Sequence, residues 1–328
     1  MLGNWKKPLG WMLGLGLAAI CTPAWAVPSL PQPGALNYVE GQASIDNSVV
    51  TSKSVGSAVM NAGDVLSTGN GRAEILLTPG VFMRIGKDSS VRMIAPELTN
   101  TRVEVLHGQA MVEADIIHKE DHIIVAERGA TAELDKKGVY DFNANAGVIR
   151  VFDGQATVTQ GDQQTDVKKD KQVMVDAPKL KAQKFDKDEA QASDPLYSWS
   201  KLRSEYLAEA TASTAQTYIV DTGGWYGPGW YWNPWWSMYS FVPGDGFFYS
   251  PFGFGLYSPV YLYSYGGGLY PHGFYGRGLY GRSVSGRGVY GRAPAVRSAP
   301  AFRAGGMGGG FRGGFAGGGF HGGGGFHR

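Results

Sequence analysis

Two histidines four residues apart have the types and spacing that most resemble a metal site. They are His118 and His122, and imidazole nitrogens and carboxylates are common ligands of divalent metals. The acidic residues around them are Asp115, Glu120 and Asp121. On a helix the two histidines would share a face. The isoleucine pairs on both sides instead predict strand, polar turn and strand, so the side chains should diverge. We expect a solvated turn and no bound metal.

Signatures of catalytic nucleophiles are missing from the sequence. It contains no Gly-x-Ser-x-Gly, no His-Glu-x-x-His and no phosphate-binding glycine loop. Carboxylates between Glu104 and Asp162 are spread along expected strands, without a pair spaced for acid–base work. We therefore expect no catalytic residues, no cofactor and a protein that is not an enzyme.

The C-terminal third gathers the side chains suited to binding. Residues 222–328 hold 32 of the 50 glycines and 28 of the 41 aromatic residues, with eight arginines, no lysine and one acid, Asp245. The candidate interaction residues are Trp225, Trp230, Trp232, Trp235, Trp236, Arg277, Arg282, Arg287, Arg292 and Arg297. Arginines attract anionic polymers, and tryptophan faces stack on sugars. Arginine also binds tyrosine through cation–π contacts, so self-association is a further candidate.

The scaffold for these side chains should be mainly β, because short β-branched runs alternate with Gly, Asp and Asn over residues 36–178. One phrase, apolar-polar-Gly-Gln-Ala-polar-apolar, occurs three times. Its central residues are Gly41, Gln42, Ala43, Gly108, Gln109, Ala110, Gly154, Gln155 and Ala156. Glycine permits the positive φ of a turn, and alanine leaves room where strands cross. We interpret the phrase as a structural turn, and around Asp153-Gly154 it predicts strand, tight turn and strand.

A longer motif lies between the first two repeats. Its residues are Gly63, Asp64, Thr68, Gly69, Gly80 and Gly86. Together with the repeats this pattern resembles the FecR domain over about residues 36–175, which implies an antiparallel β-sandwich or a solenoid-like domain. Two departures are Thr78-Pro79-Gly80-Val81 in place of the usual Asp-Gly-Ser, and Lys87-Asp88 in place of a Pro- or Asn-containing turn. Pro-Gly still supplies type II turn geometry.

An amphipathic helix is predicted after the β domain, over residues 193–212. Asp194 is its N-cap, Pro195 suits the first helical position, and the apolar stripe should pack on the β domain. The stripe consists of Leu196, Trp199, Leu202, Tyr206 and Leu207. The charged residues 179–192 before the helix predict a solvated connector.

The aromatic residues 213–265 predict irregular loops, and the Arg/Gly-rich residues 266–328 predict disorder. The aromatic extension also resembles that of exported FecR-domain proteins of soil bacteria.

The first residues have the pattern of a secretory signal peptide over residues 1–26. Lys6-Lys7 precede 13 apolar-rich residues, and Ala24 and Ala26 form the cleavage site. A proline-rich linker, residues 27–35, should follow. Lipidation at Cys21 is the alternative, although Ile20 stands where a small residue is favoured. We expect a mature chain without a transmembrane segment, located in the periplasm or at the cell surface.

FecR domains are known from regulators of iron uptake, in which a periplasmic portion receives a signal from an outer-membrane receptor and a cytoplasmic segment acts on a sigma factor. We expect this chain to lack the cytoplasmic segment and its transmembrane helix. The resemblance then implies an exported receiving or scaffold module whose partner is an envelope protein. The alternative is a surface or matrix protein whose tail self-associates or binds anionic polymers or glycans. Export argues against nucleic acid in the cytoplasm as the partner.

Overall fold

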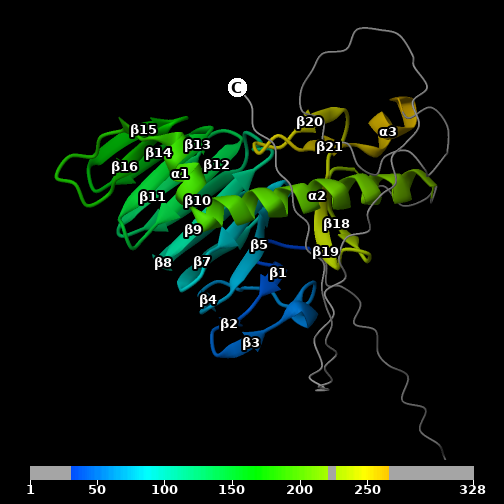
Figure 1. Ribbon diagram of the computed structural model, residues 1–328, viewed down its shortest axis with the longest axis horizontal. Helices are drawn as coiled ribbons and strands as arrows, with labels where there is room; N and C mark the ends of the chain where they lie inside the picture. Colours follow the sequence, from blue (N-terminus) through cyan, green and yellow to red (C-terminus); the bar gives the residue numbers. More distant parts are fainter. Residues whose placement is uncertain (1–30, 221–226, 266–328) are drawn as a thin grey trace, which may run out of the picture. The chain divides into compact units, whose positions relative to one another are not determined.

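The computed structural model describes residues 31–220 and 227–265. Backbone contacts divide the chain into two units, Met1–Leu269 and Tyr270–Arg328, and every described residue belongs to the first. The described part is mainly β, as the sequence predicts, with one long helix after the sheets (Figure 1). Within this part, no helix is both long enough and apolar enough to cross a bilayer.

Several predicted features lie outside the described residues. These are the signal peptide with Ala24 and Ala26, Trp225, the tail 266–328, and the arginines Arg277, Arg282, Arg287, Arg292 and Arg297.

Two large sheets form the β domain. The first, which we call the covered sheet, has eight strands in the order β1-β5-β6-β9-β12-β13-β16-β17. Their bounds are β1 Leu36–Glu40, β5 Arg72–Thr78, β6 Val81–Ile85, β9 Gln109–Ala114, β12 Gly138–Asn143, β13 Val148–Asp153, β16 Lys171–Met174 and β17 Gln183–Lys184. Its central strands are buried along nearly their whole length, so both faces of this sheet are covered.

The second sheet, the open sheet, has nine strands in the order β15-β14-β11-β10-β8-β7-β4-β2-β3. Their bounds are β2 Ala43–Ile45, β3 Ser48–Val50, β4 Val65–Thr68, β7 Ser89–Glu97, β8 Asn100–His107, β10 His122–Glu127, β11 Ala130–Leu134, β14 Gln155–Gln160 and β15 Gln163–Lys168; a short 3-10 helix, η1, spans Ser52–Ser54. Buried and accessible residues alternate along its central strands. One face therefore packs on the covered sheet and the other faces solvent.

The core lies between the sheets and is built by residues such as Ile75, Met83, Val112, Val125 and Val158. Strands β8 and β10 pair in parallel, whereas the other strand pairs of the described residues are antiparallel. The parallel pair arises because the chain leaves β8, crosses to the covered sheet as β9, and returns as β10. This one pair departs from the antiparallel pattern predicted for the domain, and the path agrees with the solenoid-like form of that prediction.

The three Gly-Gln-Ala repeats lie where the chain passes from one sheet to the other, between β1 and β2, β8 and β9, and β13 and β14. All three glycines have positive φ, with Gly108 at 77° and Gly154 at 98°. A Cβ on Gly108 would lie 2.6 Å from the carbonyl oxygen of Asp88. The repeated phrase thus marks corners at which strands approach too closely for a side chain.

The strand, tight turn and strand predicted around Asp153-Gly154 are present, but the two strands do not pair with each other as a hairpin. Strand β13 pairs with β12 and β16 of the covered sheet, while β14 pairs with β11 and β15 of the open sheet. The buried Tyr140 fills the corner, where its hydroxyl donates to the carbonyl oxygen of Gln155 (3.1 Å). Period-two patterning describes each strand correctly. It does not tell whether the turn folds the chain back on itself or carries it into a facing sheet.

Helix α2 spans Pro195–Val220, longer than the predicted 193–212. Its stripe is only partly as predicted, because Leu196, Trp199 and Leu207 are buried, whereas Leu202 and Tyr206 are exposed. Polar Arg203, Ser204, Thr211 and Thr214 are buried instead. The buried face of α2 is therefore partly polar. Its polar side chains make hydrogen bonds to the sheet and the hairpins, which a purely apolar stripe would not.

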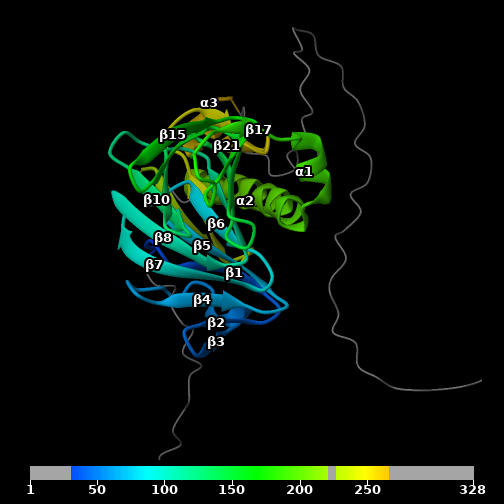
Figure 2. The ribbon, with the colours of Figure 1, turned by 90° about the vertical axis from the view of Figure 1, so that its left-hand side faces the viewer.

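Residues on both sides of α2 form regular elements where a connector and loops were predicted. These are α1 Lys187–Ser193, the hairpin of β18 Gly229–Asn233 with β19 Met238–Val242, the hairpin of β20 Phe247–Tyr249 with β21 Gly255–Tyr257, and α3 Pro259–Tyr265. We call residues 187–265 the extension. Figure 2 shows α1 and α2 on one side of the strands, with β7, β8 and β10 on the other.

Candidate functional site

Three charged side chains lie on the outer face of the covered sheet, which is the face that the extension covers. Glu74 of β5 is the register partner of Arg84 of β6, and Glu113 of β9 follows on the next strand. Arg84 donates from Nε to Glu74 (2.8 Å) and from Nη2 to Glu113 (2.7 Å). Each of the three side chains is at most 1% exposed. Alternate residues of the same strands point into the core, so the pleat separates this polar row from the apolar interior.

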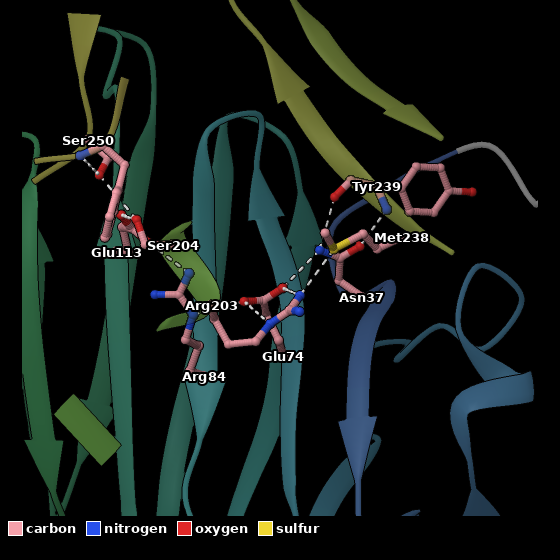
Figure 3. Close-up of polar contacts among 10 residues, drawn as sticks. Asn37, Glu74, Arg84, Glu113, Arg203, Ser204, Met238, Tyr239 and Ser250 are labelled. Atoms are coloured by element: carbon pink, nitrogen blue, oxygen red, sulfur yellow. Dashed lines mark hydrogen bonds and ion pairs between the residues drawn. The ribbon is translucent and has the colours of Figure 1, made fainter. Parts of the chain in front are cut away.

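Helix α2 supplies the group that completes this row (Figure 3). Arg203 donates from Nη2 to Glu74 Oε1 (2.8 Å), and its guanidinium lies 4.1 Å from the centre of the Tyr38 ring. The hydroxyl of Ser204 donates to Glu113 Oε1 (2.5 Å) and lies 3.1 Å from that of Ser250. We call Glu74, Arg84, Glu113, Arg203 and Ser204 the buried network.

Charge balance explains why the covered sheet needs the helix. Glu74, Arg84 and Glu113 together carry one net negative charge, and Arg203 cancels it. Burial alone would raise the pKa of Glu74, but Arg203 and Arg84 outweigh it and lower that pKa to about 2. Removing one member would leave a buried charge without its partner, which typically costs about 3–5 kcal/mol. The network therefore couples the presence of the extension to the stability of the sheet.

Asn37 of β1 links the network to the first hairpin of the extension. Its Nδ2 donates to Glu74 Oε1 (2.9 Å) and to the carbonyl oxygen of Tyr239 (3.1 Å), and its Oδ1 accepts from the backbone N–H of Tyr239 (2.7 Å). The carboxamide thus binds both backbone groups of one residue of β19, as a neighbouring strand would. Leu76 and Phe82 of the sheet pack with Tyr239 and Phe241 of the hairpin.

Asp115 lies beside the network and carries the opposite pKa shift. Its side chain is buried, and burial together with the charge of Glu113 raises its pKa well above the usual value. Its backbone N–H donates to the carbonyl oxygen of Gly80 (2.8 Å), at the turn between β5 and β6. Both effects favour the neutral form of this carboxyl group.

A second polar contact fixes the start of α2. Gln109, from the second corner repeat, donates from Nε2 to Asp141 (2.7 Å) and to Asp194 (2.7 Å). Asp194 also caps the helix by accepting from the N–H of Leu196 (2.7 Å). Burial, and after it the charge of Asp194, raises the pKa of Asp141 to about 6, although Arg150 pairs with it (3.0 Å). The repeat glutamine thus holds the helix on the β domain, a role beyond the turn predicted for it.

The motif residues bind the corners to one another. The N–H of Gly69 donates to the carbonyl of Gln42 (3.0 Å), and that of Gly86 to the carbonyl of Gln109 (2.9 Å). Thr68 donates from Oγ1 to the carbonyl of Gly86 (2.5 Å) and accepts from the N–H of Ser89 (3.1 Å). The remaining motif residues form turns: Gly63 and Gly80 have positive φ, and Asp64 accepts from the N–H of Asn61 (2.8 Å). Their contacts are thus structural ones.

The two histidines make contacts with different residues. His118 begins a turn in which its N–H donates to Asp121 (2.9 Å), whereas His122 opens β10 and its Nδ1 lies 2.7 Å from Glu133. In residues 31–220 and 227–265 no group of three or more His, Cys, Asp or Glu side chains is arranged to hold a metal ion.

Among the predicted interaction residues, the described tryptophans divide into two groups. Trp230 is buried in the extension, and Trp232 packs edge-on against Tyr239, with ring centres 5.1 Å apart. Trp235 is 87% exposed and Trp236 is 37% exposed, at the turn between β18 and β19. Only this second group is available to a ligand.

Sequence reasoning missed the buried network, although a signal for it exists. A charged residue interrupts each of three apolar strands, in Ala-Glu-Ile, Met-Arg-Ile and Val-Glu-Ala. Such residues are seldom fully buried unless they are paired. Opposite charges on neighbouring strands would indicate a mutual contact, but nothing local identifies Arg203, 129 positions after Glu74, as the partner.

Chemically the network is suited to holding elements together. Its carboxylates and guanidinium groups pair with one another and are buried, so they are not accessible to a substrate. Fold and site together define a mainly-β protein of two stacked sheets, one of which is covered by an extension.

Comparison with known proteins yields a partial likeness. No family model matches the chain, and no curated protein matches it. Two crystal structures of an anti-sigma factor candidate from Parabacteroides distasonis ATCC 8503 are similar to it, with 14% and 16% sequence identity and TM-scores of 0.34 and 0.33. Each likeness covers 39% of this chain, and 63% and 62% of the other. The chain thus spans less than two thirds of either neighbour, and membership of the FecR family stays a prediction from the sequence motifs.

Proposed function

We propose that this chain is an exported, non-enzymatic module of the cell envelope, with a FecR-like β domain that acts as a scaffold or receiving module for another envelope protein. The observation that supports a scaffold most strongly is the buried network. It makes the extension a fixed layer on the covered sheet and leaves the outer face of the open sheet accessible. A module built this way presents two surfaces in constant relation to each other, as a scaffold requires.

The signal-peptide pattern supports export, and the FecR-like motifs support a receiving role. The contacts of the motif residues support a structural role for them and leave binding to the exposed surfaces. Exposed polar side chains such as Arg102 and Thr131 lie on the open sheet and offer hydrogen bonds, and exposed apolar side chains such as Ile94 lie on the same sheet. A transient protein partner would fit a surface of this kind.

Cell fractionation combined with site-specific photocrosslinking tests this proposal. A photoreactive residue would replace Arg102 on the open sheet or, as a control, Met111, which is buried under α2. We expect the mature protein in the periplasmic or surface fraction, and a crosslink to one defined envelope protein from position 102 only. A cytoplasmic location, or identical crosslinks from both positions, would contradict the proposal.

A surface or matrix role is the second candidate, and the exposure of Trp235 favours it. A tryptophan that is 87% exposed contributes little to folding. The backbone of its turn is nevertheless held, because Asn233 Oδ1 accepts from the backbone N–H groups of Trp235 (3.0 Å) and Trp236 (3.2 Å). Self-association, or binding of anionic polymers or glycans, would use such a group. Retention of the wild type on immobilised polymer, compared with that of Trp235→Ala, distinguishes this role from the first.

A further inference from the structure

An exposed patch combines aromatic rings with carboxylates on the solvent side of α2. We call it the aromatic–acidic patch, and its members are Leu202, Glu205, Tyr206, Glu209, Trp235 and Trp236. The Tyr206 and Trp236 rings pack with their centres 5.7 Å apart. Asn233 donates to the carbonyl of Ala210 (3.1 Å), which holds the β18–β19 turn beside this part of the helix. The patch is therefore a fixed surface made by two elements of the extension.

The carboxylates of the patch have no cationic partner among the described residues. Glu205 and Glu209 are one helical turn apart and so repel each other. Burial, followed by the charge of Glu205, raises the pKa of Glu209. Lys201 stands one turn before Glu205, but no ion pair joins them. A positively charged ligand would relieve this repulsion, whereas an anionic polymer would increase it.

Guanidinium groups meet both chemical features of the patch. Arginine stacks on tryptophan and tyrosine faces and forms paired hydrogen bonds with a carboxylate, which lysine does less well. The chain itself carries such groups. Residues 266–328 contain eight arginines and no acid, whereas residues 31–265 contain 28 acidic and 20 basic residues. The two segments thus have equal and opposite net charges.

We propose that the aromatic–acidic patch binds the arginine–tyrosine repeat, residues 277–297, of a second copy of the chain. The repeat has an arginine at every fifth position, with Tyr280 and Tyr290 between them. Five residues span at most about 17 Å, so a patch of this size engages one or two arginines and leaves the others for further copies. Association is then multivalent and weakens as salt rises. This association deepens the proposed surface or matrix role, and its biological meaning rests on that role.

Complementation between two full-length variants tests the proposal. The donor-deficient variant replaces the five arginines of residues 277–297 with glutamine. The receiver-deficient variant combines Glu205→Gln, Glu209→Gln and Trp235→Ala. Sedimentation velocity at ~50 mM salt, well below physiological screening, gives the association of each.

We expect the wild type to associate and each variant alone to associate at least about tenfold more weakly, the loss expected for several cation–π contacts and ion pairs. An equimolar mixture should form heterodimers, because each variant retains what the other lacks. A monomeric wild type, a receiver-deficient variant that associates like the wild type, or a mixture without heterodimers would overturn the proposal.

Matched controls separate the patch from general surface effects. Val49→Ala removes another exposed apolar side chain, and Glu120→Gln removes an exposed acid outside the extension, so both should associate like the wild type. Equal melting curves for all variants would show that the fold is retained. If Trp235→Ala abolished retention on a neutral polysaccharide while association persisted, the patch would be a glycan site and the proposal would be wrong.

The test also distinguishes this inference from the proposed functions. Association is measured with purified protein, so its failure would leave the crosslinking result on the open sheet unaffected. Conversely, a cytoplasmic location would contradict the envelope role without changing the measured association.

Discussion

The two sheets share one core but differ on their outer faces. The outer face of the covered sheet carries Glu74, Arg84 and Glu113 in full burial, whereas the outer face of the open sheet carries a similar cross-strand pair, Arg92 and Glu104, in contact with solvent. The two ion pairs have nearly equal distances, 2.8 Å for Arg84–Glu74 and 2.9 Å for Arg92–Glu104. What differs is the extension above them. Burial turns an ordinary surface pair into a contact on which the fold depends.

The largest difference should come from removing one arginine on each side. Arg203→Met keeps most of the side-chain volume but leaves the buried network with one uncompensated negative charge, so the free energy of unfolding should fall by about 3–5 kcal/mol. Arg92→Met should change it by about 0.5 kcal/mol or less, because that pair is exposed. Urea unfolding measures both. Equal losses for the two variants would refute the distinction between the faces.

Acid should lower the free energy of unfolding by protonating Glu74. Its pKa is about 2 when folded, against an ordinary value near 4.5, so its contribution is fully present above about pH 4.5 and is lost as the pH falls toward 2. Glu74→Gln should be less stable than the wild type at pH 7 by about 3 kcal/mol. This gap should narrow steadily in unfolding experiments from pH 5 to pH 2.5. A gap independent of pH would contradict the assigned charge of Glu74.

Glu127 on the open sheet should give the free energy of unfolding the opposite dependence on pH. Its side chain is buried, and burial, followed by the charge of Asp141, raises its pKa to about 8. A carboxyl group whose pKa is raised on folding favours the folded state fully below about pH 4.5. This stabilisation is lost as the pH rises through 8. Glu127→Gln should therefore exceed the wild type in stability by an amount that grows over this range and reaches about 3 kcal/mol near pH 7.

The pH dependence of the unfolding midpoint measures this effect. Asp162→Asn, at an exposed turn, is the matched control and should show no such trend. A Glu127→Gln variant that loses stability as the pH rises would show that the wild-type carboxylate is charged and compensated.

The smallest expected effect concerns the two helix caps of the extension. Asp194→Ala removes the cap of α2 and its hydrogen bond to Gln109, which should cost about 1 kcal/mol. Asp186 caps α1, a helix without buried residues, so Asp186→Ala should leave global unfolding almost unchanged. Thermal unfolding of both variants checks this order, and the reverse order would show that α1 is the more important attachment.

The comparison also shows what could be predicted from the sequence. Alternating strands identify the open sheet, and apolar runs with single charges identify the covered one, because each pattern reflects which faces meet water. The long helix after the sheets is confirmed in kind, although it extends to Val220. The three repeats indicated turns. Their role as corners between sheets depends on which strands they join, and the local pattern does not contain that information.

The extension was the least predictable part. Pro-Gly-Trp-Tyr-Trp and similar segments have the composition of loops, yet they form hairpins because α2 and β1 supply partners for their backbone and aromatic groups. Thr211 donates to the carbonyl of Phe241 (2.9 Å), and Asn37 binds Tyr239. Partners that lie as far as 202 positions away leave no periodic signal.

The central claim is that the extension is an integral layer of the fold, and native-state hydrogen exchange of the full chain tests it most directly. If the claim holds, amides of α2 and of β18–β19 will open in the same cooperative unit as those of β6 and β9, with matching free energies of opening. In the Arg203→Met variant the free energies of opening of all these amides should fall together. Rapid exchange throughout α2 and the hairpin, beside undiminished protection of β6 and β9, would contradict it.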